Sequence, residues 1–255
     1  MNFARFSGFQ RKARSTRGTS SAALVVALCS VGAVGCGHSE PAPREPRADA
    51  SPRREKKSAQ TIRASAEIGG LNEEDVEKVF TKSQPSLVRC LNKGAQRIEF
   101  IGGKVSFFIK VGADGSVEHA HLEHSSLGDR TTEKCMLDAL RAKQFPKPVG
   151  GEHGLARKSY DFDPPADVRP ANDWDAEQLD KGLKKLADKL ESCKLGNSGR
   201  FEATAYVSTS GEVLGAGVTP PDETGEASVD CLVETLMTAT FPSPGSWPAK
   251  VTFKL

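Results

Sequence analysis

The 255-residue sequence predicts an α+β fold of two tandem α-β-β-α-β modules, each a small antiparallel sheet with two helices on one face. The first observation is a set of equal intervals in two stretches of the chain. Glu74 lies 16 residues before Cys90, and Glu177 lies 16 residues before Cys193. Further matches are Cys135 with Cys231, Gly103 with Gly199, Gly115 with Gly211, and Phe145-Pro146 with Phe241-Pro242. Such repetition indicates one module present twice.

Two further observations support this fold class. Each copy opens with an apolar stripe at helical spacing, and each then continues with apolar residues that alternate with polar ones, as in a half-buried strand. Before the Phe-Pro pairs the copies differ in spacing at one place, where the first copy has seven extra residues within 93–102.

The first helix of each copy is predicted from its apolar stripe. In the first copy Asn72, with Asp75 three residues later, is a plausible helix start. Pro85 lies inside this helix and should kink or split it. The stripes are Val76, Phe80, Ser83, Leu87 and Cys90 in the first copy, and Leu179, Leu183, Leu186, Leu190 and Cys193 in the second.

A β-hairpin is expected next. Its first strand alternates apolar positions over 105–111 in the first copy and over 201–207 in the second. Glycines 115 and 211 permit the positive φ of a tight turn, and the return strands begin at Val117 and Val213.

A second helix and a last strand complete each module. The helices carry Cys135 and Cys231 in their first turns and end before the Phe-Pro pairs. The last strands are expected at Arg157–Phe162 and Ala249–Lys254.

The N-terminal 35 residues have the pattern of an export signal, with a basic start and a short apolar run. The run ends in Ala33-Val34-Gly35-Cys36, which resembles a bacterial lipobox. The resemblance implies that Cys36 is lipidated and that the protein is anchored to the outer membrane, facing the periplasm. The alternative is ordinary cleavage near this place, which gives a soluble periplasmic protein.

Residues 36–70 are expected to form a disordered tether. The segment is rich in Pro, Arg, Glu, Ser and Ala and has almost no large apolar residue, so it cannot offset its ordering entropy by burial. The two modules are then assigned to 71–165 and 166–255.

The charge balance argues against nucleic acid as a partner. The intact chain has a formal charge of +2, but the signal segment alone carries +5. Residues 71–255 are left near −5, so the predicted folded part has no basic field of the kind that nucleic acid requires.

Four cysteines of the predicted modules are placed for one intramodule disulfide each, Cys90 with Cys135 and Cys193 with Cys231. Small domains outside the cytoplasm depend on such bonds. A zinc site is the rival interpretation, but the chain has no Cys-x-x-Cys pair and the gaps of 45 and 38 residues lack zinc spacing.

The first copy is similar to the TonB C-terminal-like domain, in the form that ends myxobacterial gliding-motility proteins. The resemblance covers about residues 71–163, and the second copy keeps its cysteines, glycines and Phe-Pro while replacing the Ser-Ser-Leu run by Pro220-Pro221-Asp222. It implies an envelope adaptor or coupling domain without catalysis. The residues that carry it are Cys90, Gly103–Ile109, Asp114–Val117, Ser125–Leu127, Cys135 and Phe145–Pro148.

No sequence motif for catalysis or for a cofactor is found, and we expect neither an enzyme nor a bound cofactor. The strongest candidate for other chemistry is a histidine cluster. His119 and His121 share one face of a strand and His124 follows, so a borderline metal could find two or three imidazoles. Exposed polar surface is the more common role of such histidines, and we expect no metal site.

Candidate partner-binding residues are Phe108, Lys110 and Tyr206. Phe108 and Tyr206 should point away from the core, and an exposed aromatic on an antiparallel sheet suits β-augmentation by a partner peptide. The alternative is that the neighbouring copy covers this face.

The sequence therefore predicts a non-catalytic envelope lipoprotein that presents peptide- or protein-binding modules in the periplasm. Expected partners are an envelope protein or peptide and the membrane, through Cys36, with peptidoglycan as a further candidate. The alternatives are a periplasmic metal-binding protein that uses His119, His121 and His124, and a structural spacer associated with the cell wall.

Overall fold

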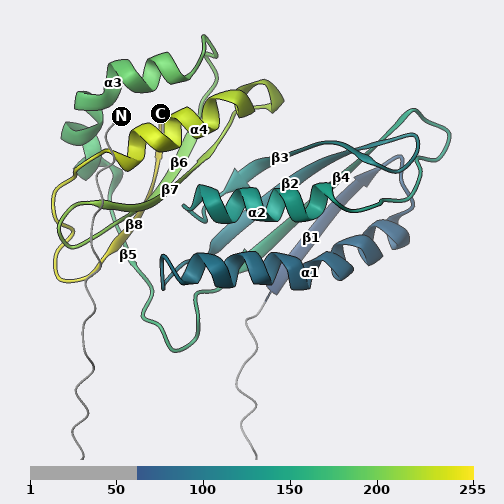
Figure 1. Cartoon of the computed structure of the whole chain (residues 1–255), viewed down its shortest axis with the longest axis horizontal. Helices are drawn as coiled ribbons and strands as arrows, with labels where there is room; N and C mark the ends of the chain where they lie inside the picture. Colours follow the sequence, from purple (N-terminus) through teal and green to yellow (C-terminus); the bar gives the residue numbers. More distant parts are fainter. Residues whose placement is uncertain (1–61) are drawn as a thin grey trace, which may run out of the picture. The chain divides into compact units, whose positions relative to one another are not determined.

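The structure is a computed structural model that describes residues 62–255. The expected signal segment, Cys36 and the tether up to residue 61 lie outside these residues. Within the described part the chain is α+β, with four α-helices, two four-stranded sheets and two disulfide bonds (Figure 1). None of these helices is long and apolar enough to span a membrane.

The first sheet is entirely antiparallel, with the strand order β1-β4-β2-β3. The helices α1 and α2 cover one of its faces (Figure 1). In chain order the elements are β1 (Ile62–Gly69), α1 (Glu73–Ala95), β2 (Gly103–Gly112), β3 (Val117–Ser125), α2 (Arg130–Arg141) and β4 (His153–Phe162).

Strand β1 lies in the segment for which the sequence predicts a tether. It pairs along its whole length with β4, from Ile62 opposite Phe162 to Gly69 opposite Leu155. The tether prediction is therefore wrong for residues 62–69. Backbone pairing with β4 supplies the hydrogen bonds that this polar, small-residue segment could not obtain alone.

Helix α1 begins as its sequence predicts. The Asn72 side chain accepts a hydrogen bond from the Asp75 backbone N–H at 3.0 Å and caps the first turn. Pro85 does not split the helix, which runs from Glu73 to Ala95 without a break. The side chain of Pro85 is exposed, so its ring meets solvent rather than a packed neighbour.

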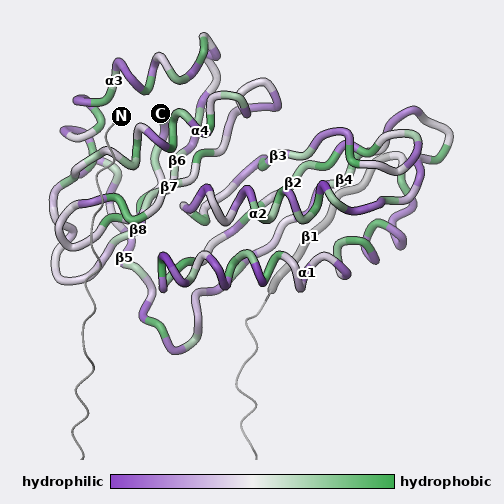
Figure 2. The backbone as a smooth tube through the Cα atoms, viewed as in Figure 1, coloured by the Kyte–Doolittle hydropathy of each residue, from purple (hydrophilic) through white to green (hydrophobic). Residues whose placement is uncertain are grey.

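The core of the first half lies between the helices and the inner face of the sheet. Val105, Phe107, Ile109 and Val111 of β2 are all fully buried, as the alternation predicts. Apolar residues of α1 and α2 pack against them, among them Phe80, Leu87, Met136 and Leu140. Figure 2 shows hydrophobic residues recurring between hydrophilic ones along both helices.

The second sheet has the strand order β5-β8-β6-β7. Strand β5 pairs parallel with β8, so this sheet is not purely antiparallel as predicted. The elements are β5 (Asn172–Asp173), the 3-10 turn η1 (Ala176–Leu179), α3 (Asp180–Cys193), β6 (Glu202–Val207), β7 (Val213–Thr219), the 3-10 turn η2 (Glu223–Gly225), α4 (Glu226–Met237) and β8 (Ala249–Lys254).

The matched glycine and Phe-Pro positions have the same structural role in both halves. Gly115 and Gly211 have φ values of +89° and +87°, in the left-handed region that favours glycine. The carbonyl of each accepts a hydrogen bond from a phenylalanine N–H, Phe145 at 2.9 Å and Phe241 at 2.8 Å. The hairpin turn is thus tied to the segment that follows the second helix, which fixes the spacing between glycine and phenylalanine.

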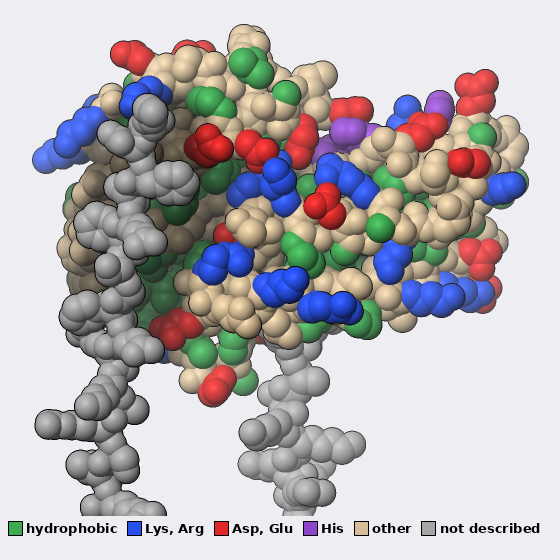
Figure 3. Space-filling model, viewed as in Figure 1, with side chains coloured by type: hydrophobic (Ala, Val, Ile, Leu, Met, Phe, Trp, Pro, Cys, Tyr) green, Lys and Arg blue, Asp and Glu red, His purple; other side chains and the backbone are tan. Residues whose placement is uncertain are grey.

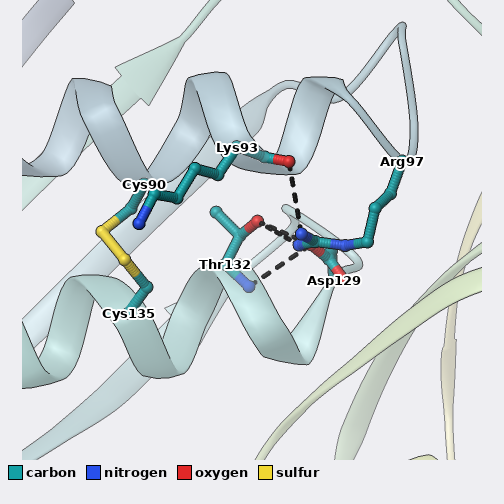
Figure 4. The surroundings of a disulfide bond; sticks show 6 residues. All are labelled: Cys90, Lys93, Arg97, Asp129, Thr132 and Cys135. Atoms are coloured by element: carbon teal, nitrogen blue, oxygen red, sulfur yellow. Dashed lines mark hydrogen bonds and ion pairs between the residues drawn. A yellow bond between two sulfur atoms is a disulfide. The ribbon is translucent and has the colours of Figure 1, made fainter.

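Both expected disulfides are present. Cys90–Cys135 joins α1 to α2, and Cys193–Cys231 joins α3 to α4. Figure 4 shows that a polar cluster lies one to two turns from the first bond, where Arg97 pairs with Asp129 and donates to Thr132 Oγ1 at 3.1 Å. Asp129 also caps α2 by accepting from the Thr132 N–H. These contacts and the disulfide fix α1 against α2.

Candidate interaction site

The outer face of the first sheet, the face away from α1 and α2, carries two of the three predicted partner-binding residues. The register places Phe108 of β2 between His121 of β3 and Arg157 of β4. The next row places Lys110 between His119 and Leu155. We call this surface the outer face, defined by Ser106, Phe108, Lys110, His119, His121, Leu155, Arg157 and Ser159.

Phe108 lies at the centre of the outer face and is half-buried. The Arg157 guanidinium lies over its ring at 4.9 Å from the centroid, and the His121 ring centroid is also 4.9 Å away. Arg157 donates from Nε to Glu123 Oε1 at 2.8 Å, which holds the guanidinium over the ring. The result is a rigid amphipathic patch of an aromatic ring edged by charged groups.

Lys110 contributes a charged rim to the outer face. Its Nζ lies 3.5 Å from Glu118 Oε2, and both side chains are about one third exposed. Neighbouring Leu155 is also partly exposed. Figure 3 draws the opposite side, that of α1 and α2, where basic and acidic side chains lie interspersed.

Tyr206 is not part of an exposed surface. Its side chain points to the outer side of the second sheet, but it is 1% exposed and the first half of the chain covers it. Tyr206 Oη donates to the Gly102 carbonyl and accepts from the Gly102 N–H, both at 3.2 Å. The prediction that Tyr206 is exposed is therefore wrong, because the neighbouring half covers this face.

The first half (residues 62–165) meets the second half (166–255) through the stretch in which the sequence has seven extra residues. Ile98 and Phe100 from this stretch are at most 5% exposed. The Phe100 ring lies 5.4 Å from Tyr206 and 6.2 Å from Trp247, centroid to centroid. Lys250 Nζ donates to the Gly102 carbonyl at 2.7 Å. The extra residues thus form part of the contact.

Two glycines of β7 make room for this contact. A Cβ added at Gly215 would collide with the Ile98 side chain, and one added at Gly217 would collide with both carboxylate oxygens of Glu133. In the sequence these glycines align with His119 and His121 of the first copy. Their small size lets the second sheet lie directly against the first half.

Charged side chains also pair across the contact. Arg130 of α2 donates to Glu226 at 3.1 Å and to Asp230 at 2.8 Å, both on α4. Its guanidinium is largely buried, so this double pairing is less weakened by water than a surface ion pair. Lys134 adds a second donor to Asp230 at 3.1 Å.

The predicted histidine cluster belongs to the same contact. His124 Nδ1 lies 3.1 Å from Glu202 Oε1, and His119 Nδ1 lies 3.4 Å from Glu223 Oε1. His119 Nε2 and His121 Nδ1 are 3.1 Å apart, so one ring donates and the other accepts. Burial lowers the pKa of His121, and the neighbouring His119 lowers it further.

The geometry gives no support to metal binding at these histidines. Their nitrogens are directed at one another and at separate glutamates rather than at a common point. Nowhere in residues 62–255 do three or more His, Cys, Asp or Glu side chains lie together as a metal ion would need.

Glu133 is a buried carboxyl group at the centre of the contact. It is 0% exposed and its Oε1 accepts a hydrogen bond from Ser125 Oγ at 2.6 Å. The other oxygen, Oε2, is buried and has no hydrogen-bond partner among residues 62–255. Burial raises the pKa of Glu133 to about 7, and the Ser125 hydrogen bond acts in the opposite direction.

Sequence reasoning did not identify the residues that join the halves. Ile98, Phe100, Gly102 and Glu133 follow no known motif, and the role of each depends on the residue that it meets in the other half. The seven-residue surplus at 93–102 was the one available signal, since an insertion in one copy of a repeat marks a place where the copies have different neighbours.

No protein-family model, curated protein or solved structure matches this chain. The similarity to the TonB C-terminal-like domain therefore rests on the residues of the first copy alone, and the family stays a prediction.

Proposed function

We propose that the chain is a non-catalytic, lipid-anchored envelope protein whose first module binds a peptide or protein partner at the outer face around Phe108. In this proposal two related α-β-β-α-β modules, 71–165 and 166–255, follow a signal segment and a tether. Cys36 carries the lipid and holds the protein at the outer membrane, and no cofactor or metal takes part.

One observation carries the proposal: the two sheets differ in what covers their outer sides. The outer side of the second sheet is filled by the first half, and Thr204 and Tyr206 there are at most 1% exposed. On the first sheet the second half covers only the β3 side, where His119 pairs with Glu223 and His121 is buried. Phe108 remains half-buried, with Lys110 and Arg157 beside it. Aromatic and arginine side chains are enriched where proteins bind one another, which favours this face as the partner site.

The two edge strands of the first sheet determine where a partner strand could pair with it. One edge of the first sheet is β3, and at its end the Ser125 N–H is already bound to Thr219 Oγ1 of the second half at 2.9 Å. The opposite edge is β1. A partner strand added by β-augmentation would therefore pair with β1, which would lie between the partner strand and β4.

Affinity capture from oxidised, detergent-solubilised envelopes tests the proposal. The full chain serves as bait in wild-type form and as Phe108→Asp, which places a charge in the aromatic patch. Val149→Asp is the matched control, because Val149 is 76% exposed in a loop and receives the same new charge. The expected result is a partner retained by wild type and by the control and lost with Phe108→Asp.

Two outcomes would redirect the proposal. Equal capture by all three baits would show that the partner binds at a surface that does not include Phe108. Capture of peptidoglycan alone, unchanged by either substitution, would favour the cell-wall spacer over the adaptor.

A further inference from the structure

Glu133 combines three features that are costly in a folded protein. Its carboxyl group is fully buried, one of its oxygens has no hydrogen-bond partner in the described part of the chain, and it lies directly against the backbone of β7 at Gly217. A neutral carboxylic acid tolerates this position far better than a carboxylate, because burying an unpaired charge is much more costly than burying a neutral polar group. The site lies between the two halves, so the free-energy cost of burying this group weakens the contact between them.

The neighbouring charges cannot satisfy an ionised Glu133. Arg130, on the same helix, lowers the pKa of Glu133 through its charge, but its guanidinium donates its hydrogen bonds to Glu226 and Asp230 of α4. Asp129, at the start of α2, and Glu226 of α4 both raise the pKa of Glu133. Asp129 forms an ion pair with Arg97, and Asp230 forms a second ion pair with Lys134. Tyr206 of β6 lies nearby, and burial raises the pKa of its phenol so that it stays neutral. From β3 and β7 the group meets Ser125 and Gly217, which carry no charge.

We propose that Glu133 is a proton-controlled latch that holds the two halves of the chain together when it is neutral and loosens their contact when it is ionised. Separation of α2 from β7 would expose the carboxylate to water and remove the cost of its burial. Proton binding and contact between the halves are therefore coupled at this residue.

The sign of the coupling follows from linkage. The pKa of Glu133 is raised from 4.5 to about 7 in the closed structure, so the closed form binds the proton more tightly than the open form. The contribution of Glu133 to the contact is fully present below pH 4.5 and is lost as the pH rises through about 7. Between pH 5 and 7.5 the equilibrium constant for closure should fall about 50-fold from this group alone.

Trp247 provides the readout. It belongs to the second half and its ring lies 6.2 Å from Phe100 of the first half. The chain has two tryptophans, so Trp174→Phe leaves Trp247 as the only one. Acrylamide quenching of Trp247 in the full-length oxidised chain then measures how far the halves have separated. The titration stays at or below pH 7.5, because burial lowers the pKa of Lys250, which lies at the same contact, to about 8.

Glu133→Gln is the decisive variant, since glutamine keeps the shape of the side chain and never ionises. In wild type, quenching should increase as the pH rises from 5 to 7.5, and in Glu133→Gln it should stay at the low value. Ser125→Ala removes the hydrogen bond that favours the ionised form, so it should extend the loosening to higher pH. Glu191→Gln, on the exposed side of α3, is the control and should behave as wild type.

The proposal is overturned if wild type shows no increase in quenching over this range. It is also overturned if a folded Glu133→Gln, judged by circular dichroism, shows the wild-type increase, because another group would then be responsible. If Glu133→Gln fails to fold, the wild-type titration and the shift in Ser125→Ala decide: an unshifted curve contradicts the role of Glu133.

Discussion

At the scale of single residues, Tyr206 makes the most specific contact between the halves. Its hydroxyl both donates to and accepts from the backbone of Gly102, and burial raises its pKa so that it stays neutral. Tyr206→Phe removes both bonds and leaves the Gly102 N–H buried without that acceptor. We expect the free energy of unfolding to fall by about 1–3 kcal/mol, as measured by urea denaturation.

Tyr160 is the matched control for this prediction. It is also 1% exposed, but its hydroxyl has no hydrogen-bond partner in the described structure. Tyr160→Phe should therefore leave the stability unchanged or raise it slightly, since it removes an unsatisfied polar group. A loss in Tyr206→Phe no larger than the change in Tyr160→Phe would contradict the importance of the Gly102 bonds.

At the scale of elements, the structure explains which parts of the fold the sequence could predict. The start of α1 at Asn72 and the strand Ala249–Lys254 follow from local signals, a capping side chain and an alternating pattern, and both are confirmed. Strand β5, of two residues, has no such signal and exists through its pairing with β8. In β1 the alternation of Ile62, Ala64, Ala66 and Ile68 was visible, but its small apolar residues next to a Pro- and charge-rich stretch favoured a tether.

The same division applies to the candidate site. The position of Phe108 opposite the core follows from the period of a strand, and the structure agrees. The burial of Tyr206 obeys the same period and could not be read from it, because its cover comes from Phe100 and Gly102, more than one hundred residues earlier in the chain. Local patterns predict the direction of a side chain, whereas its exposure depends on distant residues.

The two disulfides permit a prediction at this scale. Cys90–Cys135 spans 45 residues and Cys193–Cys231 spans 38, and both join the two helices of one half. Loop closure varies only slowly with loop length, so replacing either pair by alanine should lower the free energy of unfolding by a similar amount, about 4 kcal/mol. Denaturant titration of the two double variants measures both losses.

A large difference between the stability losses of the two disulfide variants would have a specific meaning. If the loss of Cys90–Cys135 costs much less than the loss of Cys193–Cys231, the neighbouring cluster of Arg97, Asp129 and Thr132 holds α1 against α2 without the bond. Loss of all three residues of that cluster in a Cys90→Ala, Cys135→Ala background would then become the stronger perturbation.

At the scale of the whole described chain, the two halves are joined through places where their sequences differ. The stretch 93–102 of the first half, which holds the seven extra residues, includes Ile98 and Phe100, and the second half has Gly215 and Gly217 where the first half packs against it. Each half has its own disulfide, and the core of the first half takes in Tyr206 of the second half, with Trp247 packed against it. This contact therefore determines whether the halves behave as one unit.

Cooperative unfolding tests this conclusion. Both tryptophans lie in the second half, so fluorescence follows that half and the contact of Trp247 with Phe100, whereas far-ultraviolet circular dichroism follows the helices and strands of both halves. In the wild-type protein the two denaturation curves should coincide, as expected when both halves unfold together.

Phe100→Asp places a carboxylate between Tyr206 and Trp247, where it has little access to water, and should separate the two curves. Val149→Asp adds the same charge in an exposed loop and should leave them coincident. Coincident curves in Phe100→Asp would mean that the coupling runs through the charged pairs of Arg130 and not through the extra residues of the first copy.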